Sequence, residues 1–264
     1  MKLHGLIVPL ITPKFNNDID ILSFRRLIKK MVQAKVEAIF ILGTMGEFQY
    51  LTLEQKKSLV KEASRVIKRK LPLLVGISSA KLSDSLDLID FCESYGVDYL
   101  VLVSSFNNSD PLKTTYKVSQ KTSLPLLLYN NPDIQGGNDL PIKVLRECFK
   151  FKKVLGIKNS SKDWKYSKKI LKLLVNRFLV FTGREEYFLK SLELGAAGII
   201  SSVCNINPKL LKAFYSEKSP KLLSQIVSIK NNIKETYGST IFGIKKMLYE
   251  QKSIRSHNLF KPKL

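Results

Sequence analysis

The chain has 264 residues, 44% of them hydrophobic, which is enough to bury a sizeable core in one large domain or two small ones. Its 44 Lys and Arg residues against 22 Asp and Glu give a formal net charge of +22. No apolar run reaches the ~18 residues that a membrane-spanning helix needs. The first residues lead directly into a predicted strand, so we expect no signal peptide and a cytoplasmic protein.

The excess of basic residues is compatible with binding to nucleic acid, because clustered Lys and Arg displace counterions from phosphates. The basic residues are, however, spread over the solvent faces of predicted helices, without a nucleic-acid motif or an aromatic platform. We therefore expect the charge to attract small anionic metabolites, and a nucleic-acid partner is disfavoured.

Cysteine and histidine positions give little support to a metal site. Cys92, Cys148 and Cys204 are far apart, and each lies in an apolar segment. This pattern predicts reduced thiols in the core, and neither a disulfide framework nor a zinc site. His4 and His257 do not lie at predicted strand ends, so we expect no metal.

The predicted elements alternate between short β-rich runs and segments whose apolar residues have helical spacing. The chain begins with a strand at residues 6–12, a helix at 21–33, a strand at 36–42, a helix at 53–70 with Thr52 as N-cap, a strand at 73–77, a helix at 83–95 and a strand at 99–103. It continues with a helix from residue 111, a strand at 126–129, a helix from 141, a strand at 154–157, a helix from 163, a strand at 178–181, a helix at 185–194, a strand at 198–201 and a helix at 208–215.

Eight strands that mostly alternate with helices predict an α/β protein whose parallel sheet closes into a (β/α)8 TIM barrel. An open doubly wound sheet is the alternative, but no Gly-x-Gly-x-x-Gly sequence follows a predicted strand. The alternation stops near residue 218, where two helices, at 222–237 and 244–251, and a basic tail at 253–264 are predicted. We therefore expect a barrel catalytic domain at residues 1–217 and a short C-terminal helical extension with its tail at residues 218–264.

Lys158 follows the predicted strand at residues 154–157, which we expect to be short and fully buried. Apolar surroundings disfavour the charged ammonium, and the neutral amine is the form that attacks a carbonyl carbon. In a chain with 44 basic residues a single lysine is more often an exposed surface group, so Lys158 gains weight only from its neighbours.

Polar side chains and glycines follow several other predicted strands. The motif GTMGE occupies residues 43–47, YNNP residues 129–132 and GRE residues 183–185. In (β/α)8 barrels the carboxyl ends of the strands meet on one rim, where the chemistry takes place. Glycines beside Thr44 and Met45 let backbone N–H groups approach a carboxylate, and the Tyr129 hydroxyl can relay a proton. With Lys158, these groups predict an amine nucleophile for a small 2-oxo acid.

Five motifs in this order resemble the lysine-dependent class I aldolases grouped with dihydrodipicolinate synthase and N-acetylneuraminate lyase. They are LIVPLITP at residues 6–13, GTMGE at 43–47, YNNP at 129–132, GIKNSS at 156–161 and GAAGIIS at 195–201. The resemblance implies Lys158 as the Schiff-base lysine without another cofactor, Tyr129 as the proton-relaying tyrosine, and Thr44 with the Met45 backbone as the site for the pyruvate carboxylate. It also implies further substrate-binding residues, namely Pro9, Gly43, Asn131, Ser160, Gly183, Arg184 and Ile200.

Departures from the family pattern point away from dihydrodipicolinate synthase. The pattern has a second Thr or Ser at the position of Met45, a relay tyrosine at Phe106 and an arginine at Ile134. Phenylalanine cannot pass a proton, and isoleucine cannot bind the carboxylate of a semialdehyde. The run FQYLTL at residues 48–53 and the short chain are instead similar to archaeal 2-keto-3-deoxygluconate aldolases, which join or split pyruvate and a sugar aldehyde such as glyceraldehyde.

The leading prediction is a reversible aldolase that cleaves a 2-keto-3-deoxy sugar acid to pyruvate and an aldehyde through an imine on Lys158. A dihydrodipicolinate synthase or an N-acetylneuraminate-lyase-like enzyme is the alternative within the family. A barrel that only binds pyruvate-like acids or nucleic acid is the alternative outside enzymes. The resemblance also implies a homo-oligomer, a tetramer in the family. Which aldehyde is used, and whether Arg184 admits a phosphorylated one, stays open.

Overall fold

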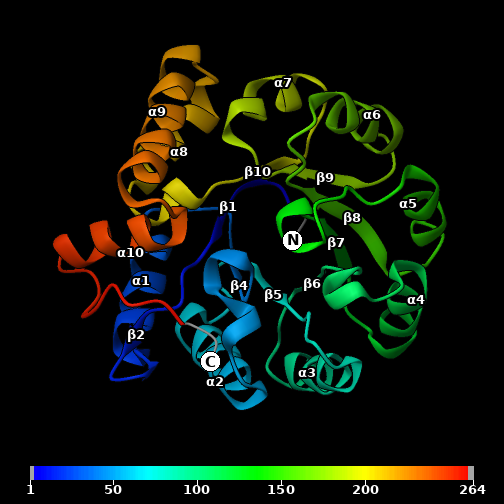
Figure 1. Cartoon of the computed structure of the whole chain (residues 1–264), viewed down its shortest axis with the longest axis horizontal. Helices are drawn as coiled ribbons and strands as arrows, with labels where there is room; N and C mark the ends of the chain where they lie inside the picture. Colours follow the sequence, from blue (N-terminus) through cyan, green and yellow to red (C-terminus); the bar gives the residue numbers. More distant parts are fainter. Residues whose placement is uncertain (1–2, 261–264) are drawn as a thin grey trace.

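The computed structural model describes residues 3–260 of the chain. Its parallel strands form a closed barrel in the order β1-β10-β9-β8-β7-β6-β5-β4, seen end-on in Figure 1. The strands are β1 (Gly5–Pro9), β4 (Ala38–Ile41), β5 (Leu73–Gly76), β6 (Tyr99–Leu102), β7 (Leu126–Asn130), β8 (Val154–Asn159), β9 (Leu179–Thr182) and β10 (Gly198–Ile200). Eight parallel strands closed in this way confirm the predicted (β/α)8 barrel.

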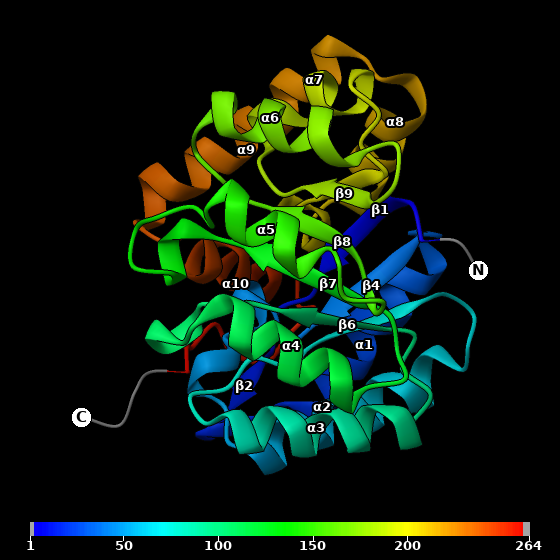
Figure 2. The same cartoon turned by 90° about the vertical axis from the view of Figure 1, so that its right-hand side faces the viewer.

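Helices follow the strands and cover the outside of the barrel (Figures 1 and 2). They are α1 (Ile21–Gln33), α2 (Leu53–Ile67), α3 (Leu82–Ser94), α4 (Pro111–Lys121), α5 (Ile142–Cys148), α6 (Trp164–Leu174), α7 (Phe188–Glu193) and α8 (Pro208–Glu217). The predicted cap of α2 is a capping box: the Thr52 hydroxyl accepts from Gln55 N at 3.2 Å, and the Gln55 side chain accepts from Thr52 N at 3.0 Å.

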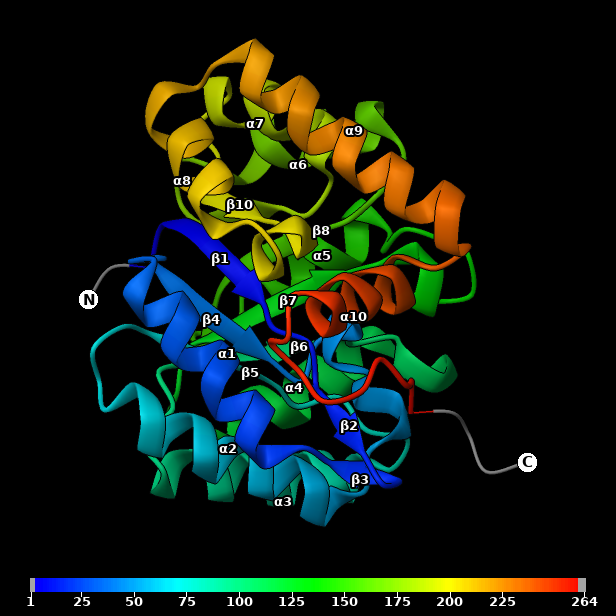
Figure 3. The same ribbon diagram turned by 90° about the vertical axis from the view of Figure 1, so that its left-hand side faces the viewer.

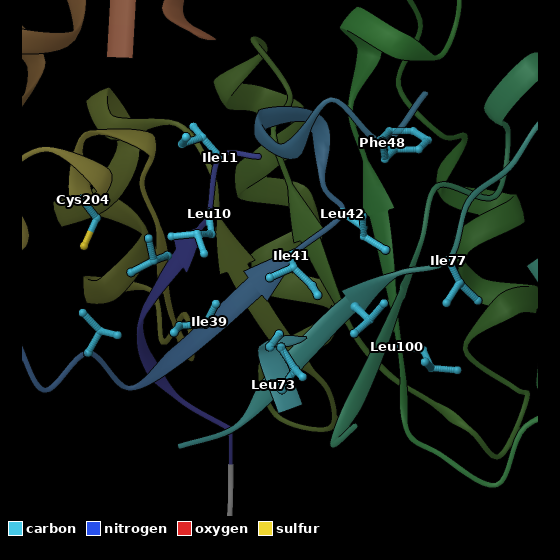
Figure 4. Close-up of a cluster of buried hydrophobic side chains, with 14 of the residues drawn as sticks. Leu10, Ile11, Ile39, Ile41, Leu42, Phe48, Leu73, Ile77, Leu100 and Cys204 are labelled. Carbon is cyan, nitrogen blue, oxygen red and sulfur yellow. The ribbon is translucent and has the colours of Figure 1, made fainter. Parts of the chain in front are cut away.

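The strand side chains alternate between two cores, because successive residues of a strand point to opposite faces of the sheet. Outward-facing residues pack under the helices, and Figure 4 shows Ile39 and Ile41 of β4 in this outer core with Leu73, Leu100 and Cys204. The inward-facing residues fill the barrel, and they include Ile7, Phe40, Leu74, Val101, Leu127, Tyr129 and Phe181. Because the interior is filled, space for a substrate has to lie at the rim of the barrel.

The strand that carries the predicted nucleophile differs from its prediction in two ways. β8 continues through Lys158 to Asn159, so the lysine belongs to the strand instead of following it. The strand is also not fully buried, since Leu155 is 40% exposed. The register with β7 shifts between Leu126 and Leu127, and Leu155 is therefore an extra residue that bulges out of the ladder.

Two other segments correct the predicted elements. A hairpin of β2 (Lys14–Phe15) and β3 (Asp18–Ile19) forms between the first predicted strand and the first predicted helix, where no strand is predicted, and Asn16 and Asn17 form its turn with positive φ angles. The predicted helix at residues 185–194 is divided into a 3₁₀ turn, Glu185–Tyr187, and α7, so its first residues remain at the rim of the barrel.

Beyond α8 the chain returns to the barrel in two helices, α9 (Pro220–Tyr237) and α10 (Thr240–Glu250), which Figure 3 shows from outside. Both begin earlier than predicted, because Ser219 and Ser239 accept hydrogen bonds from the first turns of these helices. The predicted basic tail packs against the barrel as far as residue 260, and residues 261–264 lie outside the described part. The division into a catalytic domain and an extension stays a prediction.

The cysteines agree with the expectation of core thiols. Cys92, Cys148 and Cys204 are free and buried, and burial raises the pKa of each thiol. Within residues 3–260, no helix is long and apolar enough to cross a membrane. In that same range, no group of three or more His, Cys, Asp or Glu residues could hold a metal ion.

Candidate active site

A cavity of about 160 Å³ opens at the carboxyl ends of the strands. All of the predicted catalytic and substrate-binding residues line it except Gly43. The lining residues are Pro9, Thr44, Met45, Tyr129, Asn131, Asp133, Lys158, Ser160, Gly183, Arg184, Glu185, Ile200, Ser202, Lys230 and Thr240. Residues far apart in the sequence therefore surround one small space.

Lys158 lies on the floor of this cavity with 5% of its surface exposed. It pairs with Tyr129 in the register of β7 and β8. Its Nζ lies 3.8 Å from the centroid of the Tyr129 ring and 5.2 Å from that of Phe40. The amine is thus buried against two aromatic rings, beside the hydroxyl that is predicted to serve it.

Tyr129 sits at the centre of a small hydroxyl cluster. Its hydroxyl lies 3.3 Å from the Thr44 hydroxyl and accepts a hydrogen bond from the Asn131 amide at 3.0 Å. The same amide donates to the Thr44 hydroxyl at 3.3 Å. Burial alone would raise the pKa of Tyr129, but the charge of Lys158 and hydrogen bonds to Lys158, Thr44 and Ser160 outweigh it and lower that pKa. The phenol is therefore suited to give and take a proton.

The two predicted glycines have different roles. A Cβ at Gly183 would lie 2.4 Å from Ser160 Oγ and 3.3 Å from Lys158 Cε, so the missing side chain leaves room for the Lys158 side chain. Gly43 does not line the cavity; a Cβ there would lie 2.7 Å from the Phe40 ring. The missing side chain of Gly43 thus leaves room for the Phe40 ring, and substrate binding by Gly43 stays a prediction.

A buried amide network fixes β7 against β8 directly behind Tyr129 and Lys158. Asn130 follows Tyr129, Asn159 follows Lys158, and the two asparagines are partners in the register. The Asn130 amide donates to Asn159 Oδ1 at 2.8 Å and to Asp139 Oδ1 at 2.7 Å. These hydrogen bonds prevent the strands from sliding, so the lysine and the tyrosine stay opposite each other.

Charged residues lie at the mouth of the cavity, and Arg184 is the one among them that the sequence predicts to bind substrate. Arg184 Nε donates to the Ser160 carbonyl at 3.0 Å, and its guanidinium lies 3.6 Å from Asp133 Oδ2. Glu185 is buried, and it forms an ion pair with Lys230 of α9. Each cation of the mouth therefore has an acidic neighbour.

Sequence reasoning missed Asp133, Glu185, Ser202, Lys230 and Thr240 as lining residues. The first three follow strands on the predicted rim, and their position could have identified them. Lys230 and Thr240 belong to α9 and α10, where no local pattern distinguishes them from other surface residues. A position after a strand is not sufficient by itself, since Ser104 and Ser105 follow strand β6 but do not line the cavity.

The arrangement is suited to chemistry on a small carbonyl compound. An amine can add to a carbonyl carbon, a tyrosine hydroxyl beside it can move protons, and Thr44 can hold that hydroxyl in place.

Comparison with known proteins places these features in a family. The model of the Dihydrodipicolinate synthetase family matches residues 2–258. An uncharacterised DapA-like lyase of Pyrococcus horikoshii is 31% identical over 243 residues, which cover 89% of this chain and 83% of that protein. A 4-hydroxy-tetrahydrodipicolinate synthase of Clostridium perfringens is 28% identical over 209 residues, or 78% and 72% of the two chains.

A solved structure extends the likeness to three dimensions. The dihydrodipicolinate synthase of Bacteroides thetaiotaomicron superposes with a TM-score of 0.88 at 27% identity, over 97% of this chain and 91% of that one. The family match contains every residue that lines the cavity. This chain belongs to the dihydrodipicolinate synthetase family and is an enzyme of its class, the pyruvate-dependent lyases.

Proposed function

We propose that this protein is a class I aldolase that reversibly cleaves a 2-keto-3-deoxy sugar acid to pyruvate and an uncharged hydroxyaldehyde such as glyceraldehyde. The observation that carries the proposal is the buried Lys158 amine, 3.8 Å from the centroid of the Tyr129 ring, in a cavity of about 160 Å³. The aldehyde and the sugar-acid substrate are the parts of the proposal that go beyond the family.

The reaction begins when the neutral Lys158 amine adds to the C2 carbonyl and forms a carbinolamine. Tyr129 gives its proton to the carbinolamine hydroxyl, which leaves as water, so that an iminium on Lys158 and a Tyr129 phenolate remain. Tyr129 then takes the proton of the C4 hydroxyl while the C3–C4 bond breaks. The electrons of that bond move into the iminium, the aldehyde leaves, and an enamine of pyruvate remains. Tyr129 returns the proton to C3, and water hydrolyses the imine to release pyruvate and the free Lys158 amine. The lowered pKa of Tyr129 supports this double role.

The carboxylate of the pyruvyl part binds beside Thr44 in this proposal. Thr44 and Met45 both line the cavity, and the turn that they form exposes its first backbone N–H groups, which can bind an anion. Met45 supplies no hydroxyl, so one side-chain hydrogen bond to the carboxylate is absent.

Two positions at which the family pattern has polar or charged residues are apolar here, and this favours a neutral partner. Phe106 packs against Phe48, with ring centroids 5.0 Å apart, and Ile134 packs against the barrel core. Neither can pair with a carboxylate, whereas Asn131 and Ser160 in the cavity wall can bind hydroxyl groups. An aldehyde whose carboxylate stays unpaired in this site would lose the solvation of that group, which costs several kcal/mol. Its specificity constant should therefore be at least ~10³-fold lower than that of a neutral aldehyde.

The second candidate is 4-hydroxy-tetrahydrodipicolinate synthase, and the observation that favours it is the name of the relative from Clostridium perfringens. In that case the partner of pyruvate would be an aldehyde that carries a carboxylate, and Arg184 would have to leave Asp133 to bind it. An N-acetylneuraminate-lyase-like activity differs only in a longer aldehyde. A cytoplasmic location and a homo-oligomeric state, a tetramer in particular, also stay predictions.

Borohydride reduction in the presence of pyruvate tests the imine. We expect one adduct, on the peptide that contains Lys158, and none in Lys158→Ala. Lys165→Ala, which removes an exposed lysine of α6, is the control and keeps the adduct. An adduct on a different lysine, or no adduct in the wild type, contradicts the mechanism.

Specificity constants for condensation of pyruvate with glyceraldehyde and with aspartate semialdehyde test the substrate. We expect glyceraldehyde to be the better partner in the wild type. Arg184→Ala should leave this order unchanged, because Arg184 already donates to a backbone carbonyl. A wild type that prefers aspartate semialdehyde supports the synthase instead, and release of pyruvate from a panel of 2-keto-3-deoxy acids then tests the cleavage direction.

A further inference from the structure

An outer helix contributes a charged residue to the cavity wall. Lys230 lies in α9, which runs along the barrel outside the repeating strand–helix units (Figure 3). Its side chain is 20% exposed and lines the cavity. The Nζ forms an ion pair with Glu185 and lies 4.0 Å from Glu186 Oε2. The extension therefore supplies one of the two cations, besides the catalytic Lys158, that line the space around the substrate.

Glu185 uses both of its carboxylate oxygens inside the protein. Oε1 accepts from the Ser201 hydroxyl at 2.9 Å, and Oε2 binds the Lys230 ammonium. The Glu185 side chain is only 2% exposed, so water cannot replace Lys230 as its partner. Without the Lys230 ammonium the carboxylate would stay buried and unpaired, which is costly in free energy. The cation is thus held by a buried acid at the edge of the cavity.

The second cation of the mouth is held in the same way. Arg184 donates to the Ser160 carbonyl and faces Asp133, which also binds Lys162. Arg184 and Lys230 are therefore balanced by Asp133 and Glu185 in the cavity wall. An anionic group on the aldehyde finds no unpaired cation there, while a hydroxyl group still finds N–H donors, since an ammonium has three.

We propose that the Glu185–Lys230 ion pair is a charge filter, which makes the cavity accept uncharged hydroxyaldehydes and reject phosphorylated or carboxylated ones. The filter rests on the proposed function, because it acts on the aldehyde partner of pyruvate. It assigns specificity to two residues, one on the β9 rim and one in the C-terminal extension. Removing Glu185 leaves Lys230 with only the more distant and more exposed Glu186, and removing Lys230 leaves the Glu185 carboxylate without its cation, so the two single variants change selectivity in opposite directions.

The test compares kcat/KM for glyceraldehyde and glyceraldehyde 3-phosphate in condensation with pyruvate. Glu185→Gln frees the Lys230 cation, and we expect the phosphorylated aldehyde to gain at least about fivefold relative to glyceraldehyde. Lys230→Gln frees the Glu185 carboxylate, and the same ratio should fall below that of the wild type. The double variant Glu185→Gln/Lys230→Gln should return it close to the wild-type value.

Two neighbouring residues provide matched controls. Glu186→Gln removes an acid 4.0 Å from Lys230 that does not line the cavity, and Lys234→Gln removes an exposed cation one turn further along α9. Both controls should leave the ratio unchanged. Opposite shifts in the two single variants cannot come from partial unfolding, which lowers both activities together. Equal shifts in one direction, or a control that matches Glu185→Gln, overturn the filter.

A second readout separates the filter from the proposed aldolase activity. Glycerol 3-phosphate should slow borohydride trapping of pyruvate more strongly in Glu185→Gln than in the wild type, whereas glycerol should act equally on both. If pyruvate is trapped but no aldehyde reacts, the proposed substrate is wrong, and this inhibition still decides on the filter. If nothing is trapped, calorimetric binding of glycerol 3-phosphate to the two proteins decides. Equal affinity overturns the proposal.

Discussion

At the scale of single residues, the proposed imine chemistry depends on how closely the side chains of Lys158 and Tyr129 approach each other. Lys158 and Tyr129 face each other across neighbouring strands, and Thr44 and Asn131 hold the tyrosine hydroxyl from the other side. Gly183 leaves the space in which the lysine lies. The site is therefore prepared before a substrate enters, which favours reaction over reorganisation.

Removing the Tyr129 hydroxyl tests its role as proton carrier. Tyr129→Phe keeps the ring that packs on Phe40 but loses the group that moves the proton, so we expect turnover to fall ~10²–10⁴-fold. Steady-state kinetics and thermal unfolding should be measured on the same sample. Near wild-type turnover with a lower Tm would mean that the tyrosine only packs.

At the scale of elements, β7 and β8 form the platform of the site. The bulge at Leu155 sets the register in which Tyr129 pairs with Lys158. The side chains of Asn130 and Asn159 hold that register from behind. Two strands of five and six residues thus hold the side chains of Tyr129 and Lys158 opposite each other, because the hydrogen bonds between the strands are buried.

Asn130→Ala tests this positioning. It leaves the Leu140 N–H and part of the Asp139 carboxylate without their partner, and we expect a loss of about 2 kcal/mol in the free energy of unfolding. Turnover should fall as well, since the register of the catalytic strands loosens. Asn138→Ala, an exposed change in the same loop, should alter neither urea unfolding nor kcat. If both variants behave alike, the network does not position the site.

At the scale of the whole molecule, the C-terminal extension is bound to the barrel through ionic contacts. Lys245 of α10 forms a fully buried ion pair with Glu47, directly after the Thr44 turn, and Phe260 N donates to the same carboxylate at 2.7 Å. Arg255 binds both oxygens of Asp20, each at 2.8 Å. The extension, as far as Phe260, is thus part of the structure that supports the rim of the cavity.

The Lys245→Met variant measures how much the buried Lys245–Glu47 ion pair contributes to the free energy of unfolding. It leaves the Glu47 carboxylate buried without its cation, which costs about 3–5 kcal/mol of the free energy of unfolding. Lys246→Met, at the next residue and partly exposed, should change it by less than about 0.5 kcal/mol. Chemical denaturation of both variants measures the difference, and equal stabilities would contradict the structural role of the pair.

Acid should release the tail before it unfolds the barrel core. Burial of Asp20 alone would raise its pKa, but hydrogen bonds from Arg255 and Ser23 outweigh it and lower the pKa from 3.8 to about 2. A lowered folded-state pKa stabilises the fold above the unfolded value, and this contribution of about 2 kcal/mol is lost as pH falls from about 4 to 2.

The Arg255→Ala variant checks the origin of that contribution. Without the guanidinium the pKa of Asp20 should rise, so acid unfolding should begin at a higher pH than in the wild type. Titration of unfolding from about pH 6 to about pH 2 at fixed ionic strength measures the shift. An unchanged acid transition would show that the tail contributes no pH-dependent stability.

The sequence by itself determined the barrel and the core of the site. Strands buried on both faces read as apolar runs, and their alternation with helices leaves few other topologies, so the rim with Thr44, Tyr129 and Lys158 could be predicted. The five motifs also identified the family that the match to residues 2–258 now supports. These features depend on apolar runs, on their alternation with helices and on short motifs, and all three can be read directly from the sequence.

Only the tertiary structure decided what surrounds that core. The bulge at Leu155 depends on the pairing of two strands. The close approach of the Phe40 ring to Gly43 depends on how strand β4 packs against the segment that follows it. Lys230 reaches the cavity from α9, a helix far along the chain. In the sequence it cannot be told from other lysines on solvent faces, and only the fold brings it next to Glu185. Contacts between distant segments leave no period or motif in the sequence, since their energy comes from burial and charge pairing that exist only in the folded chain.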